Sequence, residues 1–149
     1  MGMTLVLAFV GAAIAAGVGT IWYSPATPMG RWHMQFLGFD ALSEEEQKKK
    51  REEAKPKMLK MYGAQIVLSW LMALAVVTIV TMSMRNGLTF IMALGFVLFN
   101  WLCFVVPVIG SGIIWGNGDT TVAWKKFFSD SLSNLVTMFL IALVAGLSL

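Results

Sequence analysis

Hydrophobic positions dominate this chain in four long runs, and short polar stretches separate them. The runs cover residues 3–24, 58–84, 88–115 and 126–148. About 20 apolar residues in a helix suffice to cross the roughly 30 Å hydrocarbon core of a bilayer. We therefore predict an all-α fold, a polytopic membrane protein whose four transmembrane helices form a bundle, with residues 1–149 in a single membrane domain.

Aromatic, basic and proline residues mark the expected membrane boundaries. The first run ends in Trp-Tyr-Ser-Pro at residues 22–25; Trp and Tyr favour the headgroup level, and proline cannot continue a helix. Pro28 and Gly30 interrupt residues 25–39, which are too apolar for open water and are expected to lie along the membrane surface. The predicted interface anchors are Trp22, Tyr23, Pro25, Trp32, Trp124, Lys125 and Lys126.

A charged stretch separates the first two runs. Twelve of the nineteen formal charges fall within residues 40–57. Ser43 and Glu46 have the spacing of a capping box, and acidic residues precede basic ones by four positions, which supports a helix. We predict a short, solvated charged helix over about 43–55, ended by a break or bend at Pro56.

The basic residues also predict the orientation of the chain. Eight Lys or Arg lie between the first and second runs and two between the third and fourth, whereas the opposite side has only Arg85. Loops rich in Lys and Arg remain in the cytoplasm. We expect a multi-pass protein of the cell membrane with a cytoplasmic charged loop and both termini extracytoplasmic.

Composition excludes an ordinary soluble domain. The chain is 13% charged and 58% hydrophobic, with a mean hydropathy of +0.75, whereas soluble domains are about a quarter charged. A pI near 9.2 would suggest nucleic acid in a soluble protein, but here the basic residues cluster at a membrane boundary. Membrane lipid is therefore the expected partner, and nucleic acid is not.

Small residues in the first run suggest a close helix contact. They recur at helical spacing, which lets another helix approach in lipid, where van der Waals packing is a main force between helices. Because the chain is also too small to enclose a wide cavity alone, we expect a homo-oligomer. The predicted packing stripe is Ala8, Ala12, Ala16 and Gly19.

The second and third runs are longer than the bilayer core requires, so tilting or kinking is expected. Pro107 is one candidate, because its ring clashes with the carbonyl of Cys103 and removes a helical donor. Gly110 and Gly112 add flexibility near the end of the third run.

Four polar residues within the runs are candidates for function, since polar groups in a bilayer are costly. By residue counting, Asn134, Asn100 and Gln65 fall at similar depths, and Asp130 lies one turn from Asn134. One interpretation is a polar layer along a hydrated path for a solute. The plainer one is that interhelical hydrogen bonds hold the bundle together and Asp130 complements a helix N-terminus.

No pattern of catalytic or cofactor-binding residues is present. The eleven methionines are scattered, and His33 lies in an irregular segment, so no copper or other metal site is predicted. Glycine-rich phosphate loops, nucleophile elbows and paired-histidine metal motifs are missing from the sequence. We therefore expect no cofactor and no enzymatic activity.

Two motifs resemble those of the small four-span membrane proteins grouped as domain-of-unknown-function family 1761. They are the Gly-Thr-Ile-Trp-Tyr-Ser-Pro sequence at 19–25, followed by Gly-Arg-Trp at 30–32, and the Trp-Lys-Lys-Phe-Phe-Ser-Asp entry to the last run at 124–130. Members of that family often carry His at the position of Asn134, and an amide does not titrate near neutral pH. The resemblance implies a four-span fold and no established activity.

Three functions from different classes stay open on this basis. The first is a homo-oligomeric protein that binds or passes a small solute or ion through the polar layer. The second is a non-transporting accessory or scaffold subunit, whose charged helix binds a cytoplasmic partner. The third and most remote is an enzyme that acts on lipid. Solute flux, partner capture and product formation would distinguish them.

Overall fold

The computed structural model describes residues 2–115 and 120–149, and all secondary structure in these ranges is helical. Four helical segments are long and apolar enough to cross a membrane: α1, α3, the continuous run from α4 to α5, and α6. The four-span membrane fold is confirmed. The elements are α1 (Gly2–Trp22), α2 (Pro28–Phe36), α3 (Glu44–Arg85), α4 (Phe90–Asn100), the π turn η1 (Trp101–Val105), α5 (Val106–Ile114) and α6 (Thr120–Leu147).

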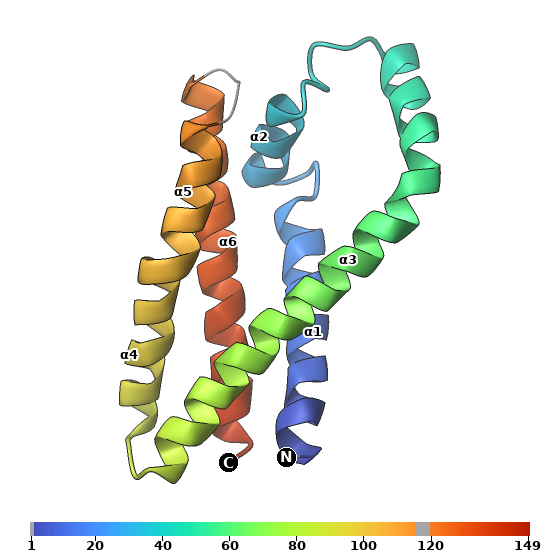
Figure 1. Ribbon diagram of the computed structural model, residues 1–149. Helices are drawn as coiled ribbons and strands as arrows, with labels where there is room; N and C mark the ends of the chain where they lie inside the picture. Colours follow the sequence, from blue (N-terminus) through green and yellow to red (C-terminus); the bar gives the residue numbers. More distant parts are fainter. Residues whose placement is uncertain (1, 116–119) are drawn as a thin grey trace.

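Three of the spans run alongside one another, and α3 crosses them obliquely (Figure 1). The two termini lie at one end of the bundle, and α2 lies at the other, which we call the α2 end. From residue 58 to Arg85, α3 rises about 40 Å at 1.5 Å per residue. That length exceeds the roughly 30 Å bilayer core, and an oblique course accommodates the excess.

The core lies where α1, α3, α4 and α6 meet. Most of its buried side chains are small or branched, which lets these helices approach closely. One close approach is at Gly11, where a Cβ atom would lie 2.7 Å from Ala73 Cβ and 3.1 Å from Ile141 Cγ2. The fully buried residues of this core include Ala8, Ala73, Val76, Val77, Val80, Ile141, Ala142 and Ala145.

The predicted packing stripe only partly faces this core. Ala8 is buried, Ala12 and Gly19 are half-buried, and Ala16 is exposed. At Gly19 an added Cβ would have nothing within 4 Å. The tight contact of α1 therefore depends on Gly11, which the stripe of small residues did not include.

The charged residues are helical, but the prediction of a separate short helix that ends near Pro56 is not confirmed. They are the first turns of α3, whose 42 residues run without interruption through Pro56. The capping box is present: Ser43 Oγ accepts from the Glu46 amide, and the Glu46 carboxylate accepts from the Ser43 amide. Because water can hydrogen-bond the carbonyl that Pro56 leaves free, proline bends this exposed helix without ending it.

The acidic and basic residues that lie four positions apart in this stretch do not form a series of ion pairs. Within the described part of the charged stretch, the one ion pair joins Lys55 to Glu52 at 2.7 Å, and both side chains are more than half exposed. Glu46 instead bonds Ser43. Exposed pairs contribute little free energy, which is consistent with the capping bond that Glu46 makes in place of an ion pair.

The third span carries a π turn next to its proline. Across η1 the amide of Val106 donates to the carbonyl of Trp101, five residues earlier, and Pro107 follows in the first turn of α5. The wider turn accommodates the missing proline donor within a continuous helical run. Near the end of this span, a Cβ at Gly110 would lie 3.4 Å from Phe127, whereas one at Gly112 would meet nothing within 4 Å.

Candidate functional site

A tight turn after α1 folds α2 back against α6. Thr27 caps α2: its hydroxyl accepts from the Gly30 amide at 3.0 Å and donates to the carbonyl of Trp22 at 2.7 Å. A Cβ at Gly30 would collide with the backbone carbonyl of Ser24. Glycine is therefore required here for a close backbone approach.

Residues 25–39 are consequently more regular than predicted. Pro28 occupies the first turn of a helix, where proline is tolerated, and Gly30 lies inside that helix. The expectation that these two residues interrupt an irregular segment was wrong for 28–36. Proline and glycine were interpreted as breakers, but here they start a helix and let it pack on the preceding turn.

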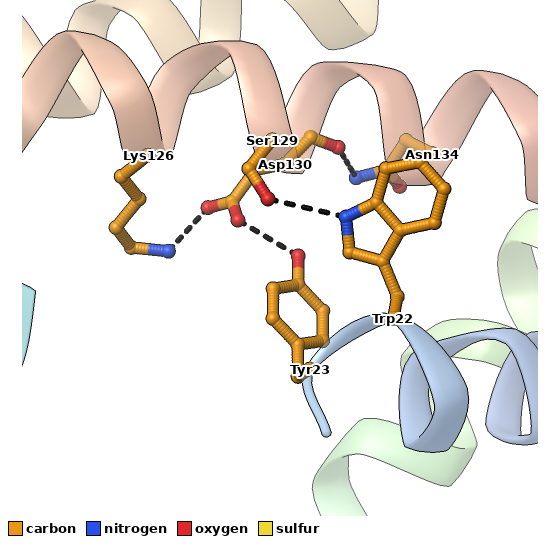
Figure 2. A network of polar contacts seen from close by, with 6 residues as sticks. All are labelled: Trp22, Tyr23, Lys126, Ser129, Asp130 and Asn134. Carbon is orange, nitrogen blue, oxygen red and sulfur yellow. Dashed lines mark hydrogen bonds and ion pairs between the residues drawn. The ribbon is translucent and has the colours of Figure 1, made fainter. Parts of the chain in front are cut away.

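The end of α1 bonds directly to the first turns of α6. The Tyr23 hydroxyl donates to Asp130 Oδ1 at 2.7 Å, and Trp22 Nε1 donates to Ser129 Oγ at 3.1 Å (Figure 2). The Lys126 ammonium pairs with the other oxygen of Asp130. We call these five residues, Trp22, Tyr23, Lys126, Ser129 and Asp130, the Asp130 cluster.

The cluster is largely withdrawn from solvent. The side chains of Lys126 and Asp130 are each only 19% exposed. Phe36 of α2 contributes to this cover, since Lys126 Nζ lies 5.1 Å from the centre of its ring. A charge pair in so apolar a chain is energetically costly to bury, which marks it as a candidate site.

Tyr23 is held as a neutral donor. Burial first, then its hydrogen bond to Asp130 and the negative charge of that carboxylate, raise the pKa of Tyr23 above its usual value of about 10. The phenol therefore keeps its proton at neutral pH and directs it at Asp130.

His33 of α2 completes one wall of the site. Its ring lies 5.0 Å from that of Tyr23, centre to centre. Its Nδ1 atom is buried and has no hydrogen-bond partner among the described residues. Burial first, and then the positive charge of Lys126, lower the pKa of His33, although Asp130 acts in the opposite direction. A neutral imidazole with an unused nitrogen therefore lies beside the cluster.

Polar side chains continue from the cluster along α6. Ser129, Ser133 and Thr137 are 4%, 6% and 5% exposed. Asn134 Nδ2 donates to the backbone carbonyl of Asp130 at 2.8 Å, and Thr137 Oγ1 to that of Ser133 at 2.8 Å. These residues recur every three or four positions, so one face of α6 is polar for three turns. This polar face begins at the Lys126 and Asp130 pair.

The four residues of the predicted polar layer do not assemble. Asp130 and Asn134 lie together on α6, but Gln65 is exposed on α3, where its Nε2 lies 3.4 Å from Ser69 Oγ. Asn100 donates to the carbonyl of Phe96 on its own helix. Residue counts along parallel helices estimate depth but not the side of the helix that a residue occupies, and the oblique course of α3 also changes the depth along that helix (Figure 1).

The predicted interface anchors have different environments. Trp22 and Tyr23 are bonded into the Asp130 cluster, as is Lys126, whereas Pro25 is exposed and Trp32 and Lys125 are half-buried. Trp124 is 45% exposed and makes an edge contact with Phe127, 5.3 Å between ring centres. Three of the anchors are therefore components of the site.

Sequence reasoning missed Ser129 and Trp101. Trp101 lies in the π turn, and its indole donates to the backbone carbonyl of Ser131 at 2.9 Å. The signal for Ser129 was present, because it lies inside the second of the two quoted motifs and Trp22 lies inside the first. The structure shows that the two motifs contact each other.

The Asp130 cluster offers a carboxylate and an ammonium group close together, with a phenol and an imidazole beside them. Such groups can bind a small polar or charged molecule through charge-assisted hydrogen bonds. Among the described residues, no group of three or more His, Cys, Asp or Glu is placed to hold a metal ion.

Comparison with known protein families gives one match, which covers residues 6–146. Neither the comparison with curated proteins nor that with solved structures gives a match. The matched region contains both motifs, nearly all of the four spans and the whole Asp130 cluster. The chain therefore belongs to the family described as protein of unknown function DUF1761.

Proposed function

We propose that this membrane protein is a homo-oligomer that binds, and passes across the membrane, a small polar solute or ion at the Asp130 cluster. The observation that carries the proposal is the Lys126 and Asp130 pair, which is only 19% exposed and is bonded to Tyr23. Ionisable groups in apolar bundles characteristically line substrate and ion pathways.

The geometry supports binding in two ways. Asp130 and Lys126 supply opposite charges that can separate to engage a ligand, and the polar face of α6 continues inward through Ser133 and Thr137. In addition, α2 covers the cluster through Phe36 and His33. Because the short turn at residues 23–27 connects α2 to α1, movement of α2 would open or close access to the charge pair.

Oligomerisation is supported by polar groups on the outside of the single chain. Gln65 is exposed on α3, and Asn100 is half-buried on α4, and both lie within helices that can cross a membrane. An amide facing lipid is unfavourable, whereas an amide facing another helix gains an interhelical hydrogen bond. Each amide nitrogen already donates to its own helix, and a second copy packed against these helices could supply donors to the amide oxygens.

Flux measurements on reconstituted protein test the proposal. Wild-type protein in liposomes should pass at least one member of a panel of ions and small polar solutes. Asp130→Asn and Asn134→Leu should lower that flux at least tenfold, and Asp40→Asn should leave it unchanged, because Asp40 is exposed and lies before α3. Absence of flux and of saturable binding throughout the panel would count against the proposal.

A second candidate function is a non-transporting accessory subunit. It rests on the exposed first turns of α3, which extend beyond the bundle (Figure 1). Under this alternative, Asp130→Asn would lower the stability of the protein, and neither the wild type nor this variant would show solute flux. Replacing the acidic residues Glu44 and Glu45 by Gln would abolish capture of a protein partner while the bundle stays folded.

A further inference from the structure

The first turns of α3 combine exposure with an unusual distribution of charge. Between residues 47 and 60, seven Lys or Arg and two Glu give a net charge of +5. Every residue from 48 to 57 is exposed. Only Lys55 forms an ion pair among the described residues of this stretch, and that pair is itself mostly solvated. We call residues 47–60 the basic collar.

Basic side chains surround the helix on all sides. Because successive residues are 100° apart around the helix axis, the basic side chains fall into three groups that point in different directions, and no side of the helix lacks a positive charge. A protein partner would contact one face of a helix, whereas lipid headgroups surround a helix that passes through them. The seven are Lys48, Arg51 and Lys55 on one side, Lys49 and Lys60 on the second, and Lys50 and Lys57 on the third.

Along α3, the basic collar is followed directly by a segment whose exposed side chains are apolar. Leu59 is 81% exposed, Met61 66% and Tyr62 57%, and Lys60 lies between the first two. An exposed apolar surface of this kind requires hydrocarbon, and a lysine embedded in it extends its ammonium toward the headgroups. In a bilayer, this arrangement would bring the inner residues Lys55, Lys57 and Lys60 near the level of the lipid phosphates.

We propose that the basic collar binds anionic phospholipid headgroups around the point where α3 enters the membrane. Because α3 is one uninterrupted helix, lipid bound at the collar would hold the same helix whose other half packs in the core at Val76 and Val80. This inference is independent of any solute bound at the Asp130 cluster.

The proposal can be tested by measuring which lipids stay bound to the protein after extraction from vesicles. The full-length protein is reconstituted in vesicles of equal parts phosphatidylcholine and phosphatidylglycerol, extracted gently, and the bound lipids are counted by native mass spectrometry. Wild-type protein should retain phosphatidylglycerol in preference. Each basic group near an anionic surface contributes a factor of about five in affinity, so replacing Lys55, Lys57 and Lys60 by Gln should reduce the preference more than tenfold.

Matched variants make the test specific. Replacing the same three residues by Arg should keep the preference, and replacing Glu52 and Glu53 by Gln should raise it. Arg85→Gln, at the other end of α3, should have no effect. Seven of the ten basic residues of the two basic loops remain in the Gln variant, so its orientation in the membrane is maintained.

Two results would overturn the proposal. One is equal retention of the two lipids by wild-type protein, and the other is a preference that the Gln variant keeps. If wild-type protein shows no lipid preference but a protein copurifies with it and not with the Gln variant, the collar binds protein instead.

Discussion

The Tyr23 hydroxyl donates to Asp130 at 2.7 Å although 107 residues separate the two in sequence. Together with the bond from Trp22 to Ser129, this contact joins the end of the first span to the start of the last. The two donors are the last residue of α1 and the residue after it, and the two acceptors are consecutive residues of α6. The contact therefore depends on the relative rotation of α1 and α6 at the α2 end of the bundle.

Tyr23→Phe should lower the free energy of unfolding by about 1–2 kcal/mol. The substitution removes a hydrogen bond to a charged group, and such bonds contribute about 1.5–3 kcal/mol, but Asp130 keeps Lys126 as a partner. Denaturant unfolding in detergent micelles measures the change. Tyr62→Phe is the control, because Tyr62 is 57% exposed. Equal effects of the two variants would show that the bond to Asp130 contributes no stability.

Removing one member of the Lys126 and Asp130 pair should cost more than removing both. Asp130→Leu leaves a mostly buried ammonium without its partner, and Lys126→Met leaves a carboxylate with only Tyr23. Each should lose at least about 2 kcal/mol, since breaking buried pairs typically costs 3–5 kcal/mol. The double variant should be more stable than either single one. A double-mutant cycle measures this coupling, and strictly additive losses would contradict it.

Gly11→Ala should destabilise the bundle, although alanine is normally the better helix former. The added Cβ would lie 2.7 Å from Ala73 Cβ, so α1 and α3 must move apart, at a cost of about 1–3 kcal/mol. Gly17→Ala should instead be neutral or stabilising by up to about 1 kcal/mol, because nothing lies within 4 Å of its Cβ position. Thermal unfolding of both variants in one detergent checks the opposite signs.

Stability should fall on mild acidification because of His33. Its pKa is lowered in the folded protein by burial and by Lys126, so below about pH 6.5 the unfolded chain binds more protons than the folded one. The stabilising contribution is complete above that pH and is lost as the pH decreases through it. Because His33 is the single histidine, His33→Gln should remove this part of the pH dependence. A profile unchanged by that substitution would contradict the assignment.

The spans could be predicted from sequence, because the length of a hydrophobic run is a local property and the bilayer sets the length required. The capping box at Ser43 could also be predicted, since both its bonds lie within four residues. The continuity of α3 through Pro56 could not. It depends on whether water replaces the one hydrogen bond that proline removes, and proline was interpreted as the end of the helix although the stretch was expected to be solvated.

The site could be predicted only in part. Asp130 and Asn134 were candidates because polar residues are rare in a span, and they do lie side by side. Their association with Tyr23 depends on helix rotation and on the turn that Gly30 permits, neither of which follows from residue spacing. Gln65 and Asn100 were included by counting depth, which does not show the side of a helix on which a residue lies, and each amide bonds its own helix.

The π turn at Trp101–Val105 has a consequence for how the third span is phased. A π turn accommodates one more residue than an α turn, so the side chains of α5 are rotated by about 100° relative to an uninterrupted continuation of α4. The helical periodicity of this span therefore shifts by one residue at the π turn. If a single helical periodicity were applied to the whole span, the residues of one half would be assigned to the wrong face of the helix.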